Sequence, residues 1–81
     1  MRDSSLYFLK GVTRMKVYIV IGEYERSMMS EVFGAFDSRE KAVNYIQNHF
    51  ENVEYNEHVE TWIAEVFHDT VELRINWQEV Q

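Results

Sequence analysis

Residues 16–36 read KVYIVIGEYERSMMSEVFGAF, and this stretch decides the fold. It opens with a run of β-branched and aromatic residues over 16–25, which is typical of a β-strand. A second run of the same kind covers 31–36. Because only the short segment RSMMS separates the two runs, the sequence predicts an antiparallel hairpin with its loop at 26–30.

The residues after the hairpin change to a helical period. An amphipathic helix of about 13 residues is expected to begin near Asp37. Asp37 followed by Glu40 matches a capping box, and Ser38 is the rival cap. One face of the expected helix carries the apolar residues Ala42, Val43, Ile46 and Phe50.

The last third of the chain contains a polar connection and then two more apolar segments. Residues 51–58 are expected to form the connection. The segment 57–67 also fits a helix, but a strand is favoured because Val, Thr, Trp, Ile and Phe crowd it. A turn is expected at 68–70. After it, apolar and polar residues alternate strictly over 71–78, which predicts a strand with one solvent-facing side.

These elements predict an α+β domain over 15–81. Its antiparallel sheet would have three to four strands and one helix on one face, in the order β-β-α-β-β. Residues 1–14 are expected to be an N-terminal tail or docking segment, because Met15 directly precedes the first strand and resembles a translation start.

The first strand is apolar on both sides, whereas one helix covers only one face of a sheet. The face opposite the helix is therefore expected to meet the apolar cluster LYFL at 6–9, a partner, or a second copy of the chain. Two-fold dimers are the commonest closed assembly, so a homodimer is expected. The expected self-association residues are Tyr18, Val20 and Tyr24.

Several functional classes lack support in the composition. The chain has no cysteine, hence no disulfide and no thiolate metal site. It shows neither a signal-peptide pattern nor an apolar run near the ~20 residues of a membrane span, so a cytoplasmic protein without membrane contact is expected. The three histidines lack ligand spacing, so no metal is expected, and no cofactor motif is present. Glu23 and Glu25 have no accompanying nucleophile, so no enzyme is expected.

Charge is distributed unevenly along the chain, whose net charge is −6. Residues 1–50 contain seven basic and six acidic side chains, whereas 51–81 contain one basic residue, Arg74, and eight acidic ones. The acidic third would repel nucleic acid, so direct nucleic-acid binding is not expected. Two interpretations stay open: a solvated face, or a negative surface that mimics nucleic acid and docks on a basic groove. The candidate partner-binding residues are Glu54, Glu57, Glu60, Glu65, Asp69 and Glu72, together with the adaptable Met28 and Met29 of the hairpin loop.

The stretches MKVYIVIGEYE at 15–25 and SEVFGAFDSREKAVNYI at 30–46 resemble small uncharacterised proteins of phages and prophages in Gram-positive bacteria. Those proteins share a strand that opens with Met-Lys-Val-Tyr, a hairpin and a helix entered through a similar motif. The resemblance supplies no catalytic residues. It implies a phage context, in which small acidic proteins bind and block host machinery. The expected function is thus inhibition or modulation of a host or defence protein through its basic surface. The alternative is a homo-oligomeric structural or assembly protein.

Overall fold

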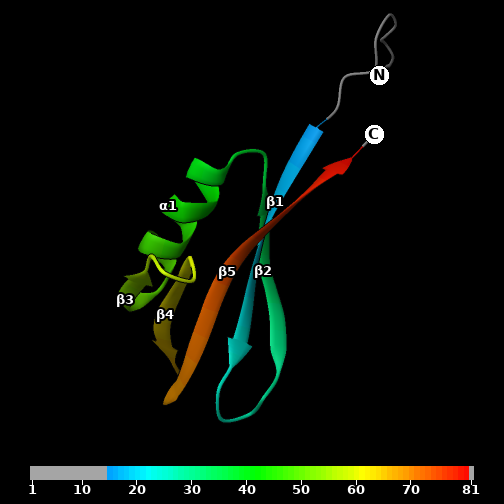
Figure 1. Ribbon diagram of the computed structural model, residues 1–81. Coiled ribbons are helices and arrows are strands. Elements are labelled where there is room, and N and C mark those ends of the chain that lie inside the picture. The colour runs from blue at the N-terminus through cyan, green and yellow to red at the C-terminus, as the bar shows by residue number, and fades with distance from the viewer. Residues whose placement is uncertain (1–14, 81) are drawn as a thin grey trace, which may run out of the picture.

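The computed structural model describes residues 15–80 and shows one helix against one face of a five-stranded antiparallel sheet (Figure 1). The expected α+β class is confirmed, and the sheet is larger than the three to four strands predicted. The tail expected at 1–14 lies outside the described residues. The elements are β1 (Met15–Tyr24), β2 (Ser30–Phe36), α1 (Arg39–His49), β3 (Glu51–Asn56), β4 (Thr61–Val66) and β5 (Asp69–Val80).

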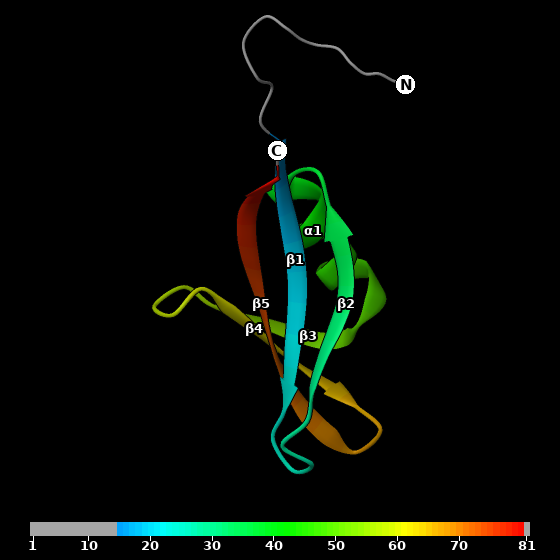
Figure 2. The ribbon, with the colours of Figure 1, turned by 90° about the vertical axis from the view of Figure 1, so that its right-hand side faces the viewer.

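The strand order β2-β1-β5-β4-β3 places the last strand of the chain in the middle of the sheet. β5 pairs with β1 from Met15↔Val80 to Tyr24↔Val71, and its first half also pairs with β4. Figure 2 looks onto the face of the sheet opposite α1 and shows how far the sheet twists between β1 and β4. We call this the outer face, and the face that α1 covers the inner face.

Of the two candidate cap residues, Ser38 and not Asp37 caps the helix. Ser38 has an extended backbone, and its hydroxyl accepts a hydrogen bond from the backbone N–H of Lys41 at 3.2 Å. This is the arrangement of an N-cap residue. Asp37 instead forms an ion pair with Lys41 at 2.9 Å. The prediction that favoured Asp37 as the cap is therefore wrong.

The core lies between α1 and the inner face. Ala42 and Ile46 of the predicted apolar helix face are completely buried, and Val43 and Phe50 pack at the margin. Aromatic rings close one side of the core, where Phe33 and Phe50 meet edge to face at 5.0 Å. The buried residues are Val20, Ala42, Ile46, Trp62, Ala64, Val71 and Leu73.

The polar connection predicted at 51–58 is wrong, because its first six residues form the edge strand β3. Its side chains are mostly exposed, its register shifts between Glu51 and Glu54, and Asn52 has a positive φ. An edge strand pairs on one side only, so the pairing with β4 holds β3 in place without an apolar pattern.

The strand favoured for 57–67 is confirmed for its second part, which is β4, while residues 57–60 form the preceding turn. The turn before β5 lies one residue earlier than predicted. Asp69 already pairs with Val66, so Phe67 and His68 alone make the turn.

The three residues expected to form a self-association surface lie on the inner face. Val20 is completely buried, and Tyr18 and Tyr24 pack against the core. They were therefore assigned to the wrong side of the sheet. Because side chains alternate along a strand, the outer face of β1 instead carries the partly buried Val17, Ile19 and Ile21. Both sides of β1 are apolar, so the pattern of β1 alone does not say which side α1 covers.

A bulge in β2 changes the order of its faces. Val20 pairs with Gly34 and Ile21 with Val32, so Phe33 is an extra residue in the ladder. As a result Phe33 and Phe36 both pack against the core. Val32, whose side chain is 64% exposed, lies on the outer face.

Candidate functional site

Acidic side chains from β3, β5 and β1 lie in a row across the outer face. Strand pairing sets Glu54 beside Ile63, Ile63 beside Glu72, and Glu72 beside Glu23. Residues directly opposite each other in antiparallel strands project from the same face. The row therefore holds three carboxylates with Ile63 among them.

Two shallow hollows extend this row. One is lined by Glu23, Glu25 and Glu72 together with Ile63, and the other by Glu54, Glu57 and Ile63. Because Ile63 lines both hollows, the acidic surface is continuous. We call it the acidic band, and its members are Glu23, Glu25, Glu54, Glu57 and Glu72.

One basic side chain of the outer face contacts the acidic band. Arg74 donates a hydrogen bond from Nη1 to Oε2 of Glu23 at 3.0 Å. Both side chains are partly exposed, and such pairs stabilise a fold by only about 0.2–1 kcal/mol. With five carboxylates and one guanidinium, the band remains strongly negative.

Carboxylates stand directly opposite each other at two points of the sheet. Glu23 pairs with Glu72 across β1 and β5, and Glu51 pairs with Glu65 across β3 and β4. Like charges in these positions repel and destabilise a sheet. This arrangement therefore works against folding, and Arg74 relieves only the first of the two pairs.

Two of the acidic residues predicted to bind a partner, Glu60 and Glu65, lie outside the acidic band. Glu65 lies on the outer side of β4 beside the band, and Glu60 lies in the β3–β4 turn with a positive φ of 55°. The structure thus brings Glu54, Glu57 and Glu72 together, with Glu65 nearby. From the sequence, Glu23 and Glu25 were weighed as catalytic residues and interpreted as charges that keep an edge or a hairpin end soluble. Their place in the band follows from the pairing of β1 with β5.

Asp69 has a structural role. Its carboxylate accepts hydrogen bonds from the backbone N–H groups of Arg26 at 2.9 Å, Ser27 at 3.3 Å and Thr70 at 2.8 Å. The hydrogen bond from Arg26 is the main reason that the pKa of Asp69 lies below its ordinary value of 3.8. Asp69 therefore ties the β4–β5 turn to the β1–β2 loop, and its role as a partner-binding residue stays a prediction.

Large apolar side chains are exposed at the end of the sheet where these two loops meet. Met28 and Met29 are exposed in the β1–β2 loop, as predicted for contact residues. Phe67, which sequence reasoning missed, is 95% exposed. Phe67 and His68 have φ values of 51° and 66°, which are typical of a two-residue turn made by Asn-Gly. A bulky residue rarely adopts this conformation.

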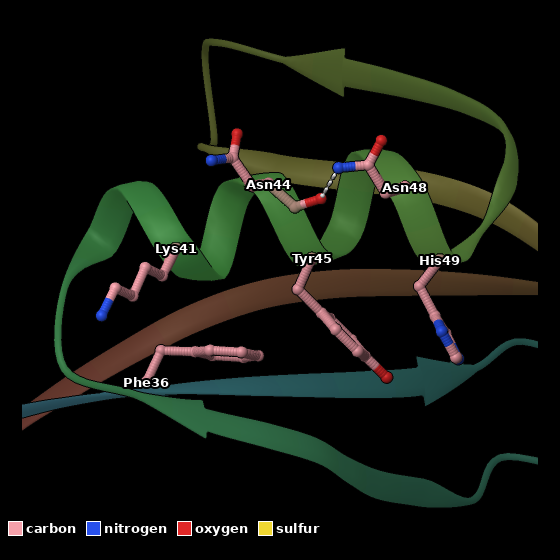
Figure 3. Close-up of a pocket in the computed structure, with 6 residues that line it drawn as sticks. All are labelled: Phe36, Lys41, Asn44, Tyr45, Asn48 and His49. Atoms are coloured by element: carbon pink, nitrogen blue, oxygen red, sulfur yellow. Dashed lines mark hydrogen bonds between the residues drawn. The ribbon is translucent and has the colours of Figure 1, made fainter.

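A third hollow of about 440 Å³ lies between α1 and β2 (Figure 3). The Tyr45 ring stacks on His49 with 4.6 Å between ring centroids and lies 5.3 Å from Phe36. Burial, followed by the negative charge of Glu31, raises the pKa of Tyr45 above its ordinary value. We call this hollow the helix–strand groove, and its lining residues are Phe36, Lys41, Asn44, Tyr45, Asn48 and His49.

Within residues 15–80, no group of three or more histidine, aspartate or glutamate side chains is arranged to hold a metal ion. The helix of this part of the chain is too short to cross a membrane. No protein-family model, curated protein or solved structure matches the chain. The resemblance to phage proteins therefore stays a prediction.

Proposed function

We propose that this protein is a small, acidic, non-enzymatic binding protein of the phage type, and that its acidic band occupies a basic surface of a host or defence protein. The binding would inhibit or modulate that protein, whose basic surface would normally hold nucleic acid. One observation carries the proposal: carboxylates stand directly opposite each other in the sheet, at Glu23↔Glu72 and Glu51↔Glu65.

The energetic argument concerns what folding alone requires. A directly opposed pair of like charges costs a sheet roughly 0.2–1 kcal/mol, whereas an opposite pair stabilises it by a similar amount. Local arrangements that oppose folding are expected mainly at functional sites. A partner that supplies lysines or arginines would turn the repulsion within the band into attraction between the two proteins.

The shape of the band also suits a protein partner. Ile63 lies at its centre, between Glu54 on one side and Glu72 on the other. Protein interfaces are typically less charged at the core than at the rim. Ile63 would supply the apolar contact at the core, and the carboxylates around it would orient the partner.

The test requires a partner captured from host lysate at low salt, identified and purified. The variant Glu54→Lys/Glu72→Lys should associate at least about tenfold more slowly than the wild type, because electrostatic steering is lost. Raising the salt concentration should shrink this difference, since the Debye length is only ~8 Å near physiological ionic strength. Nucleic acid should compete with the wild type for the same partner.

A control variant separates the band from net charge. Glu40→Lys/Asn44→Lys/Gln47→Lys changes the net charge by the same +4 on exposed positions of α1 (2 + 2 for the band variant, 2 + 1 + 1 for the control). Its association rate should fall much less than that of the band variant. Equal rates for the band variant and the wild type, without competition by nucleic acid, would show that the band is only a solvated surface.

The alternative, a homo-oligomeric structural or assembly protein, is favoured by a different region. The outer face carries Val17, Ile19 and Ile21 on β1 next to the exposed Val32 on β2. This half of the outer face is apolar apart from Glu23 near the end of β1, whereas the acidic band continues from Glu23 across β5, β4 and β3. Self-association without any other partner would support this alternative.

A further inference from the structure

The two edge strands of the sheet differ in how they are protected against pairing with another chain. The edge β3 has the sequence ENVEYN, with two carboxylates, a register shift and a positive φ at Asn52. Charges and irregular backbone are the usual protection of an edge. The edge β2 has the sequence SEVFGAF, with Glu31 as its one charged residue and neither proline nor lysine. β2 also contains a bulge, at Phe33, so the two edges differ in their number of charges and in the positive φ of Asn52, not in the presence of a register shift. Among the described strands, β2 is thus the less charged edge.

We propose that β2 is the docking site for a second copy of this chain, which adds its own β2 in antiparallel orientation. The two sheets would then form one ten-stranded sheet across a two-fold axis. This proposal concerns a surface other than the acidic band, and it stands or falls independently of the binding function proposed above.

The bulge makes β2 complementary to itself. Phe33 and Gly34 both belong to the inner face, Val32 and Ala35 to the outer face, and Glu31 and Phe36 to the inner face again. The order of faces is therefore the same in both directions from the point between Phe33 and Gly34. Two copies related by a two-fold axis at this point pair Val32 with Ala35, and Glu31 with Phe36, on matching faces. A strand without the bulge would bring opposite faces together in this register, because its side chains alternate with a period of two.

A second copy would bring a carboxylate of one chain close to a lysine of the other at this edge. Lys41 and His49 line the helix–strand groove beside Phe36. In the proposed register, Glu31 of one copy pairs with Phe36 of the other and so approaches the groove that holds Lys41. The two-fold axis creates this contact twice. Lys41 also forms an ion pair with Asp37 of its own chain at 2.9 Å, so Glu31 of the second copy would share this lysine with Asp37.

The proposed pairing would bring the helix–strand grooves of the two copies together. Both copies of α1 would lie on the same side of the joined sheet, because an antiparallel two-fold pairing within one sheet keeps the inner faces together. The grooves beside Phe36 and Tyr45 would then face each other across the junction. Glu31 accepts a hydrogen bond from the Tyr24 hydroxyl at 2.9 Å, and its negative charge raises the pKa of Tyr45, which lines the groove.

The experiment is sedimentation velocity of the full chain over a range of micromolar concentrations. We expect an equilibrium between the 9.8 kDa monomer and a dimer of twice that mass. Glu31→Lys and Lys41→Glu should each weaken dimerisation by about tenfold, because each removes two symmetry-related charge contacts. The double variant Glu31→Lys/Lys41→Glu restores opposite charges and should return the dissociation constant close to that of the wild type. Glu40→Lys makes the same charge change as Glu31→Lys on α1 outside the groove lining, and it should leave dimerisation unchanged.

Hydrogen exchange of the β2 amides gives a second readout. In the dimer, backbone amides of β2 that do not pair with β1 become hydrogen-bonded, so their protection should rise with protein concentration. A monomer at all concentrations would overturn the proposal. So would a dimer that is indifferent to the Glu31 and Lys41 variants, because its interface would then be elsewhere, for example the apolar half of the outer face. Protected β2 amides in a monomer would mean that another part of the same chain, such as residues 1–14, covers this edge, and would also overturn it.

Discussion

On most of β5, the side chains of the inner face are apolar and those of the outer face are polar or charged. On β1, the side chains of both faces are mostly apolar. Along β5, the completely buried Leu73 is preceded by the exposed Glu72 and followed by the partly buried Arg74. On β1, Val20 of the inner face and Ile19 and Ile21 of the outer face are all apolar. The inner face is therefore built for packing against α1. The outer face combines an apolar half with an acidic half in which carboxylates oppose each other, and folding alone explains neither half.

The largest expected effect contrasts two neighbours on β5. Leu73→Ala should lower the free energy of unfolding by about 2–5 kcal/mol, because it leaves a cavity in a fully packed core. Glu72→Ala, one residue away on the outer face, should change it by no more than about 0.5 kcal/mol. Urea denaturation of both variants measures the difference. Similar losses for both would mean that the outer face is packed as tightly as the inner one.

The next largest effect is expected at Gly22, where the Phe33 ring packs closely against the backbone of β1. A Cβ atom at Gly22 would lie 2.5 Å from the Phe33 ring and 2.8 Å from Val71. Gly22→Ala should therefore destabilise the protein by about 1–3 kcal/mol through overpacking. Gly34→Ala is the matched control, because its Cβ would meet only the end of the Phe36 ring at 3.0 Å. If Gly34→Ala costs as much as Gly22→Ala in the same denaturation assay, the contact of the Phe33 ring with Gly22 is not the cause of the loss.

The exposed β4–β5 turn should respond in the opposite direction. Replacing Phe67–His68 by Asn-Gly removes side chains that are unfavourable at positive φ, and should raise the free energy of unfolding by roughly 1 kcal/mol. Thermal and urea denaturation measure this gain. A loss of stability instead would show that the Phe67 ring, although 95% exposed, makes contacts that hold the turn.

The smallest effect is a pH dependence at the same end of the sheet. Because hydrogen bonds lower the pKa of Asp69, its carboxylate stabilises the fold above its ordinary pKa of 3.8, and this contribution is lost as the pH falls through the lower folded-state pKa. Asp69→Asn should be less stable than the wild type at neutral pH, and the gap in melting temperature should narrow on acidification below about pH 4. If the difference in melting temperature does not change with pH, the charge of Asp69 does not contribute to holding the β4–β5 turn and the β1–β2 loop together.

The sequence predicted those elements whose signal is local. The hairpin of β1 and β2, the apolar helix face with Ala42 and Ile46, and the alternation of β5 are all set by the spacing of apolar residues within a few turns or strand positions. The excess of acidic residues after residue 50 was also visible, and it included Glu54, Glu57 and Glu72 of the band.

The tertiary structure decided everything that depends on which strands become neighbours. β3 is a strand because β4 pairs with it, and its polar sequence gave no sign of this. Val20 is inside and Ile21 outside because α1 packs on one of two similar faces. The acidic band requires β5 to lie between β1 and β4, which brings Glu23 beside Glu72 although they are 49 positions apart. Asp69 likewise meets Arg26 only in the folded chain. Periodicity reports the two sides of a single element, whereas these contacts depend on long-range pairing that no single element encodes.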